Sequence, residues 1–78
     1  MGDLLEQQLA RVERQITKGE LHATLQRDIL SRLEAEGLGA SETAEIARDL
    51  LCLTEHRLRA HTAERKRLQA QLRRSRAA

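Results

Sequence analysis

The sequence predicts an all-α fold: a two-helix antiparallel coiled-coil hairpin with helices over about 3–36 and 41–75. Three observations predict it. The chain contains no proline, so no residue forces either helix to break. Its clearest interruption, Gly37-Leu38-Gly39-Ala40, lies near the midpoint. On both sides of it, apolar residues recur at alternating steps of three and four, the spacing of a coiled coil. Two helices of nearly equal length joined by four residues should fold back on one another.

The corner carries a stop signal and a start signal. Gly37 can adopt the left-handed conformation that ends a helix, because it has no Cβ to clash. Ser41 follows as a candidate N-cap, since its hydroxyl can accept a hydrogen bond from an unpaired backbone N–H. Glu42 and Glu45 complement the positive end of the helix dipole. We therefore expect the second helix to begin at about Ser41.

The second helix carries the more regular seam. Its heptad positions are Ala44, Ala47, Leu51, Thr54, Leu58, His61, Arg65, Leu68 and Leu72. The first helix begins with a matching row of Leu5, Leu9, Val12 and Ile16. Polar residues at seam positions commonly fix the register of a coiled coil at some cost in stability. We expect His61 to lie against Ile16 and Gly19, and Arg65 to reach Glu13 or Glu6.

Near the corner, the apolar stripe becomes wider than one partner helix can cover. After Gly19 the row in the first helix moves about a quarter turn, and the second helix adds aliphatic residues beside its seam. The predicted interface residues are Leu21, Leu25, Ile29, Ile46, Leu50 and Leu53. A short chain without aromatic residues buries little apolar surface alone. We expect it to form a homodimeric four-helix bundle, or to bind a helical protein partner.

Gly19 supports an alternative architecture, a three-helix bundle in which Thr17-Lys18-Gly19-Glu20 forms a turn. A glycine inside a helix costs only about 1 kcal/mol relative to alanine. The residue alone does not force a break, so the long hairpin is favoured.

The C-terminal part of the chain is basic. From Arg57 onward there are eight Lys and Arg residues and one acidic residue, although the net charge of the chain is only +2. Candidate nucleic-acid contacts are Arg65, Lys66, Arg67, Arg73, Arg74 and Arg76, with a basic tail from about residue 73. No aromatic residue is present to stack on a base, and basic residues suit a helix C-terminus. A solvent-facing surface is the favoured interpretation.

A metal-binding module is a further alternative. Cys52 and His56 lie four residues apart on one helical face, and His22 comes opposite them in the hairpin. Beside leucines, however, a cysteine also packs as a small hydrophobic residue, and we predict no metal and no cofactor.

The sequence holds no nucleophile–base pair, phosphate-binding glycine loop or paired-carboxylate site. We therefore expect neither an enzyme nor a small-molecule substrate.

The remaining features indicate a single cytoplasmic domain over residues 1–78. The longest apolar run, Leu50–Leu53, is far too short to span a membrane. Met1-Gly2-Asp3 does not resemble the start of a signal peptide. Cys52 is the only cysteine, which excludes an internal disulfide and suits a reducing compartment.

Several short segments carry a family resemblance. They are Gly19-Glu20, Gln26-Arg27, Ile29-Leu30, Arg32-Leu33-Glu34, Gly37, Ala47, Leu50-Leu51, Leu53 and the run His61-x-x-x-Arg65-x-Arg67-Leu68. Over about fifty residues the chain resembles a group of small, uncharacterised helical proteins of nitrogen-fixing and related alpha-proteobacteria. That group commonly has a shorter loop and an aromatic residue near Thr54, which is absent here. The resemblance implies a bacterial helical hairpin with a continuous first helix, and no particular activity.

Overall fold

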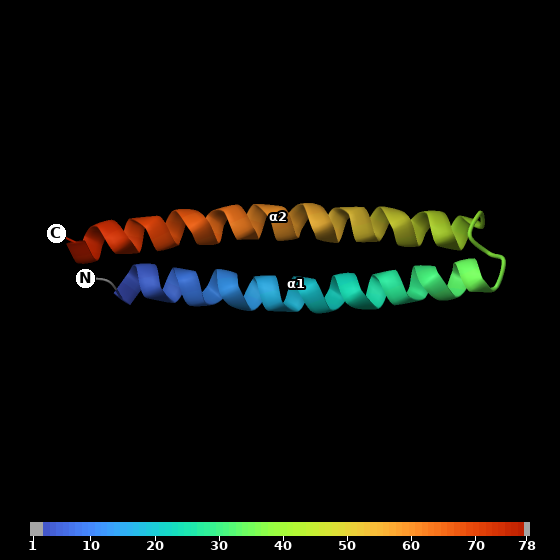
Figure 1. The fold of residues 1–78 in the computed structure, drawn as a ribbon, viewed down its shortest axis with the longest axis horizontal. Helices are drawn as coiled ribbons and strands as arrows, with labels where there is room; N and C mark the ends of the chain where they lie inside the picture. The colour runs from blue at the N-terminus through green and yellow to red at the C-terminus, as the bar shows by residue number, and fades with distance from the viewer. Residues whose placement is uncertain (1–2, 78) are drawn as a thin grey trace.

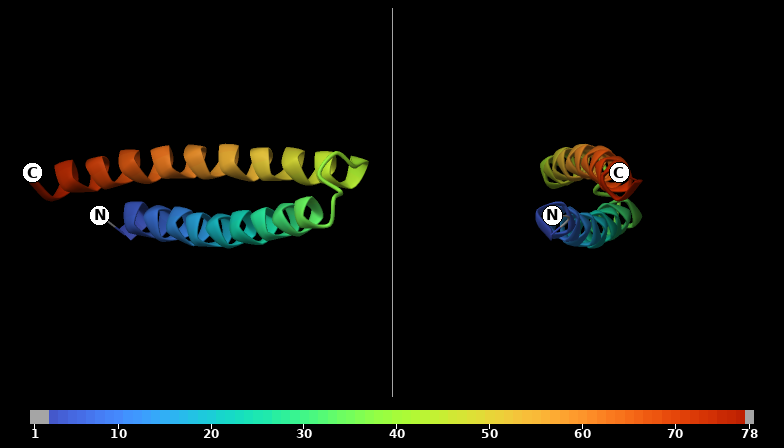
Figure 2. Two further views of the ribbon diagram at one scale, coloured as in Figure 1. Left: turned by 45° about the vertical axis from the view of Figure 1, so that its right-hand side comes forward. Right: turned by 90° about the vertical axis from the view of Figure 1, so that its left-hand side faces the viewer.

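The fold is a hairpin of two long helices. The computed structural model describes residues 3–77, with α1 over Asp3–Ala35 and α2 over Glu42–Ala77. The helices run antiparallel and side by side, with both termini at one end of the rod (Figure 1). The rod measures 59 × 14 × 14 Å, and Figure 2 shows both helices curving gently along it. The predicted all-α hairpin is confirmed.

Helix α1 continues through Gly19, so the three-helix alternative is wrong. The glycine lies where α2 comes close. A Cβ at this position would lie 2.8 Å from Leu58 Cδ2 and 3.1 Å from Leu58 Cγ. Gly19 therefore acts as the hole that receives the Leu58 side chain, in the manner of coiled-coil packing, and does not act as a turn.

The corner ends α1 with a hydrogen-bonded cap. Gly37 has a φ of 78°, in the left-handed region. Its N–H donates to the carbonyl of Glu34 at 3.1 Å, and the N–H of Leu38 donates to that of Leu33 at 2.8 Å. These two bonds form a Schellman motif, which satisfies carbonyls at the helix end. The chain thus leaves α1 one residue earlier than predicted.

The predicted N-cap begins α2. Ser41 Oγ accepts a hydrogen bond from the Ala44 N–H at 3.2 Å and donates to the Leu38 carbonyl at 2.6 Å. The helix proper starts at Glu42 and runs to Ala77, two residues beyond the predicted end. Arg74 and Arg76 in its last turn favour this extension, because cations stabilise the negative end of the helix dipole. The basic segment from residue 73 to 77 is therefore helical rather than a tail; Ala78 lies outside the described residues.

The buried core is a single seam between the helices. It consists of Val12, Ile16, Ala23, Leu30, Ala44, Leu68 and Leu72. The contact between Gly19 and Leu58 sets the register. In that register Leu30 faces Ala47 and Leu33 faces Ala44, so the corner half of the seam pairs large side chains with small ones.

The seam of α1 does not move after Gly19 as predicted. It continues through Ala23, half-buried Gln26 and Leu30, at unbroken heptad spacing from Ile16. The predicted row of Leu21, Leu25 and Ile29 is instead a second row, outside the seam and exposed. Small residues occupy the seam because α2 approaches closely there, and the larger aliphatic side chains are left on the surface.

Among residues 3–77, neither helix has a stretch apolar enough and long enough to cross a lipid bilayer.

Candidate interaction surface

The six predicted interface residues are all exposed in the single chain. Leu21, Leu25, Ile29, Ile46, Leu50 and Leu53 make up what we call the apolar surface. Their exposed fractions range from 45% for Leu53 to 59% for Leu21. Surface leucines are ordinary when they are scattered, but a cluster of this kind is typical of an interaction site.

Both helices contribute to this surface through a shared groove. Ile29 of α1 and Ile46 and Leu50 of α2 line a groove of about 190 Å³, together with Gln26, Thr43 and Ala47. The groove is almost entirely apolar at its surface. The hairpin therefore presents one hydrophobic face across two helices, where a further helix or helix pair could pack.

The groove belongs to one flank of the seam, which we call the open flank. Residues seven apart share a flank in a coiled coil, so His22 and Gln15 follow Ile29 toward the termini, and Arg57 and Glu64 follow Leu50. His22, Lys18 and Arg57 line a middle groove beside Gly19 and Leu58. The open flank thus changes from apolar near the corner to polar and basic in its middle.

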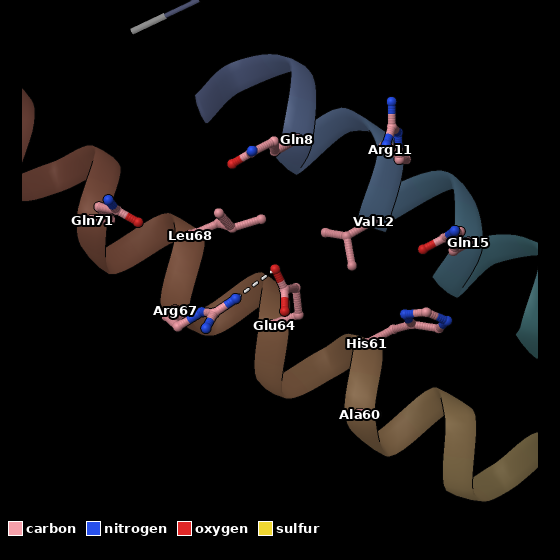
Figure 3. Close-up of a pocket in the computed structure, with 10 residues that line it drawn as sticks. All are labelled: Gln8, Arg11, Val12, Gln15, Ala60, His61, Glu64, Arg67, Leu68 and Gln71. Atoms are coloured by element: carbon pink, nitrogen blue, oxygen red, sulfur yellow. Dashed lines mark hydrogen bonds and ion pairs between the residues drawn. The ribbon is translucent and has the colours of Figure 1, made fainter. Parts of the chain in front are cut away.

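Toward the termini, the open flank is polar. Figure 3 shows Gln8 and Gln15 of α1 and Glu64 and Arg67 of α2 around a depression that Val12 and Leu68 also line, while the Arg11 side chain points away from α2. Arg67 Nη2 donates to Glu64 Oε1 at 2.7 Å within α2. This end offers mainly hydrogen-bonding groups, and among the described residues Leu4 is the one large aliphatic side chain exposed there.

The other flank of the seam, the paired flank, carries ion pairs between the helices. Arg27 Nη2 lies 3.3 Å from Glu55 Oε2, and Arg76 Nη2 lies 3.3 Å from Glu6 Oε1. Each pair is solvent-exposed and contributes at most about 1 kcal/mol. Together they link charges of opposite sign across the seam within one chain.

The predicted partners of Arg65 are wrong. Within residues 3–77 Arg65 makes neither a hydrogen bond nor an ion pair, and Glu6 pairs with Arg76 instead. Arg65 stays half-buried at its seam position, and His61 lines the middle groove with Gly19, as expected. Several long basic side chains compete for each carboxylate at a helix end, so heptad position alone does not choose between them.

The candidate nucleic-acid residues do not share one face. Lys66 and Arg73 are seven residues apart and lie along one line of α2, while Arg67 and Arg74 lie along another. Arg65 occupies the seam, and Arg67 and Arg76 are already paired with glutamates. The set surrounds the helix and does not form a single basic stripe of the kind that follows a phosphate backbone.

The candidate metal ligands are not brought together. Cys52 and His56 line a shallow depression with Asp49 and Arg59, whereas His22 lines the middle groove with Arg57. Within residues 3–77, no three His, Cys, Asp or Glu side chains lie close enough to hold a metal ion. We expected Cys52 to pack beside leucines, but its side chain is exposed.

Gln26 is a feature that the periodicity of large aliphatic residues does not reveal. Its side-chain Oε1 is buried and, among the described residues, has no hydrogen-bond partner. The residue stands in the seam and also lines the apolar groove. Only the continuous heptad through Gly19 could have indicated its position. A buried amide oxygen without a partner destabilises the hairpin, by about 1–3 kcal/mol.

Comparison with protein-family models, curated proteins and solved structures finds no match to this chain. The resemblance to alpha-proteobacterial helical proteins accordingly stays a prediction.

Proposed function

We propose that this chain is a non-catalytic interaction protein that self-associates through its apolar surface into a homodimeric four-helix bundle. The observation that carries the proposal is the gathering of Ile29, Ile46 and Leu50 from both helices around one apolar groove, with Leu21, Leu25 and Leu53 also exposed on the corner half of the rod. Full burial of a leucine or isoleucine contributes about 1.5–3 kcal/mol. Covering the exposed half of each side chain on two copies would therefore supply a substantial driving force for association.

The composition of the seam supports the same proposal. In its corner half, Gly19, Ala23, Ala44 and Ala47 contribute little buried apolar area within one chain. Leu30, Leu33 and Leu51 pack inside that half of the seam, but six further aliphatic side chains stand on its outside. A second hairpin on the open flank would give Ile29, Ile46 and Leu50 a shared core of the four-helix type.

We also propose that the protein works in a reducing cytoplasm, where the exposed thiol of Cys52 stays free.

A helical segment of another protein could occupy the same groove. We favour a second copy because its own open flank offers a matching apolar surface and complementary charges.

The test is a double substitution, Leu50→Glu with Leu53→Glu, compared with Leu4→Glu as a matched control. Leu4 is 66% exposed and lies outside the apolar surface. Sedimentation equilibrium at tens of micromolar should give a dimer for the wild type and the control, and a monomer for the double variant. Circular dichroism should show that all three remain helical. A monomeric wild type, or a double variant that still dimerises, would overturn the proposal.

A further inference from the structure

The position of the apolar surface along the rod limits how two copies can dock. At 1.5 Å per residue, Leu50 lies about 17 Å from the corner, while Lys18 and Arg57 lie about 30 Å from it. Glu36 and Glu42 stand at the corner itself. Toward the corner the apolar surface is bordered by Glu36 and Glu42, with the exposed Arg32 one turn before Glu36. Toward the middle it is bordered by Lys18 and Arg57, at a similar distance from Leu50.

These bordering charges have no ion-pair partners within residues 3–77. Lys18, Arg57, Glu36 and Glu42 are exposed. None of them forms an ion pair with another residue of the described segment 3–77. The paired flank differs, because Arg27 and Arg76 are both engaged with glutamates of the facing helix.

A symmetric dimer built face to face has two arrangements. If the two-fold axis runs along the rods, both corners lie at one end and α1 of each copy packs over α2 of the other. Lys18 then comes beside Arg57 of the second copy, and Glu36 comes beside Glu42 of the second copy. Like charges at such short range oppose association.

If the axis crosses the rods, the corners point in opposite directions and each helix packs over its own counterpart. With the axis at Leu50, Lys18 comes to the level of Glu36 of the second copy. Arg57 comes to the level of Glu42 of the second copy. Lys18 and Arg57 then come level with acidic side chains of the second copy, Arg32 comes level with its His22, and the apolar surfaces still overlap.

We propose, building on self-association through the apolar surface, that the two copies dock antiparallel, with the corner of each over the basic middle of the other. The overlap covers the corner halves as a four-helix bundle. The terminal halves project from it in opposite directions as two-helix arms.

Gln26 supports this geometry independently of charge. In α1 the axis passes within about one residue of Gln26, the residue whose buried Oε1 lacks a partner and which lines the groove. An amide is both donor and acceptor, so two symmetry-related copies are complementary to each other. In the parallel arrangement α1 faces α2, and the two Gln26 side chains do not meet.

A distance measurement tests the orientation directly. In the full chain with Cys52→Ala and Ala40→Cys, a spin label on the new cysteine reports the separation of the two corners. The antiparallel dimer predicts a separation of about 35 Å, twice the distance from the corner to the axis. A separation below about 20 Å in a confirmed dimer would overturn the antiparallel arrangement and leave self-association intact. A monomer would instead reject self-association.

Charge reversal gives a second readout. Lys18→Glu with Arg57→Glu should weaken the dimer roughly tenfold or more, because each contact changes from attraction to repulsion. Adding Glu36→Lys and Glu42→Lys should restore it. The wild-type dimer should also weaken as salt is raised. A dimer dissociation constant that is unchanged in the Lys18→Glu, Arg57→Glu variant would contradict the proposal. So would a wild-type dimer that becomes tighter as salt is raised.

Discussion

The two flanks of one seam use their side chains in opposite ways. On the paired flank, charges from α1 and α2 meet within the chain, as in the Arg27–Glu55 and Arg76–Glu6 contacts. On the open flank, Ile29, Ile46 and Leu50 line a groove that the chain leaves uncovered. Both flanks follow the same heptads. The periodicity that makes the hairpin therefore does not decide which flank pairs its side chains within the chain and which flank leaves them uncovered. That difference is set by the residues that stand next to the seam.

The largest expected effect comes from placing a charge in the open flank. Ile29→Asp should abolish self-association, lowering the association constant by more than about a hundredfold, because a carboxylate would be buried in an apolar contact. Ser31→Asp is the matched control, an exposed position on the same helix outside the apolar surface. Analytical ultracentrifugation of both variants measures the effect. Equal loss in the control would show that helix charge, and not the flank, is responsible.

The next effect concerns the hole at Gly19. Gly19→Ala should lower the free energy of unfolding by about 1–2 kcal/mol, since its Cβ would overlap Leu58. In a Leu58→Ala background the same substitution should raise it by up to about 1 kcal/mol, because alanine is the better helix former. Urea unfolding of the four proteins completes the cycle. A substitution with the same sign in both backgrounds would contradict close packing at this point.

Gln26→Leu should have opposite effects on the stability of the fold and on how precisely the two copies are oriented in the dimer. Replacing this buried amide with an aliphatic side chain is expected to raise the free energy of unfolding by about 1 kcal/mol, because a buried polar residue in a coiled-coil seam costs stability even where it has a partner. An apolar residue at the axis would also remove the polar feature that fixes how two copies meet, as buried polar residues do in coiled coils. Thermal unfolding should therefore shift upward while the corner-to-corner distances become more heterogeneous. A narrower distribution would exclude a registering role for the amide.

The smallest effect belongs to the paired flank. Replacing Arg27 and Glu55 together with alanine should change the free energy of unfolding by less than about 1 kcal/mol, since the pair is exposed to solvent. The oligomeric state should not change. Measurements in low and high salt should show that the loss shrinks as ionic strength rises. A change in dimerisation would show that the two flanks are not independent.

The hairpin itself could be predicted from the sequence because its signals are local. Gly37, Ser41 and the heptad of α2 each act within a few residues, and the structure confirms the role predicted for each. The exposure of Leu50 and Leu53 also followed from counting how much apolar width one helix can cover.

The path of the seam through α1 could not be predicted in the same way. Leu21, Leu25 and Ile29 are the most hydrophobic residues in that segment, and they define a clear row at a spacing of four. The true seam uses smaller residues, among them Gly19 and Ala23, since the distance between the helices favours small side chains there. Which row faces inward is decided by the facing helix, and a single-helix pattern does not contain that information.

The Gly19–Leu58 contact also fixes how far the two helices can slide. Moving α2 by one heptad would bring Leu58 onto Val12 or Gln26, where no vacancy exists, and would leave the glycine opposite another residue. An insertion of seven residues into one helix, between the corner and this contact, preserves every hydrophobic repeat. It would, however, move Leu58 away from Gly19 and so remove the contact. We therefore expect length changes to be tolerated only when both arms of the hairpin lengthen equally beyond it, on the side of the termini.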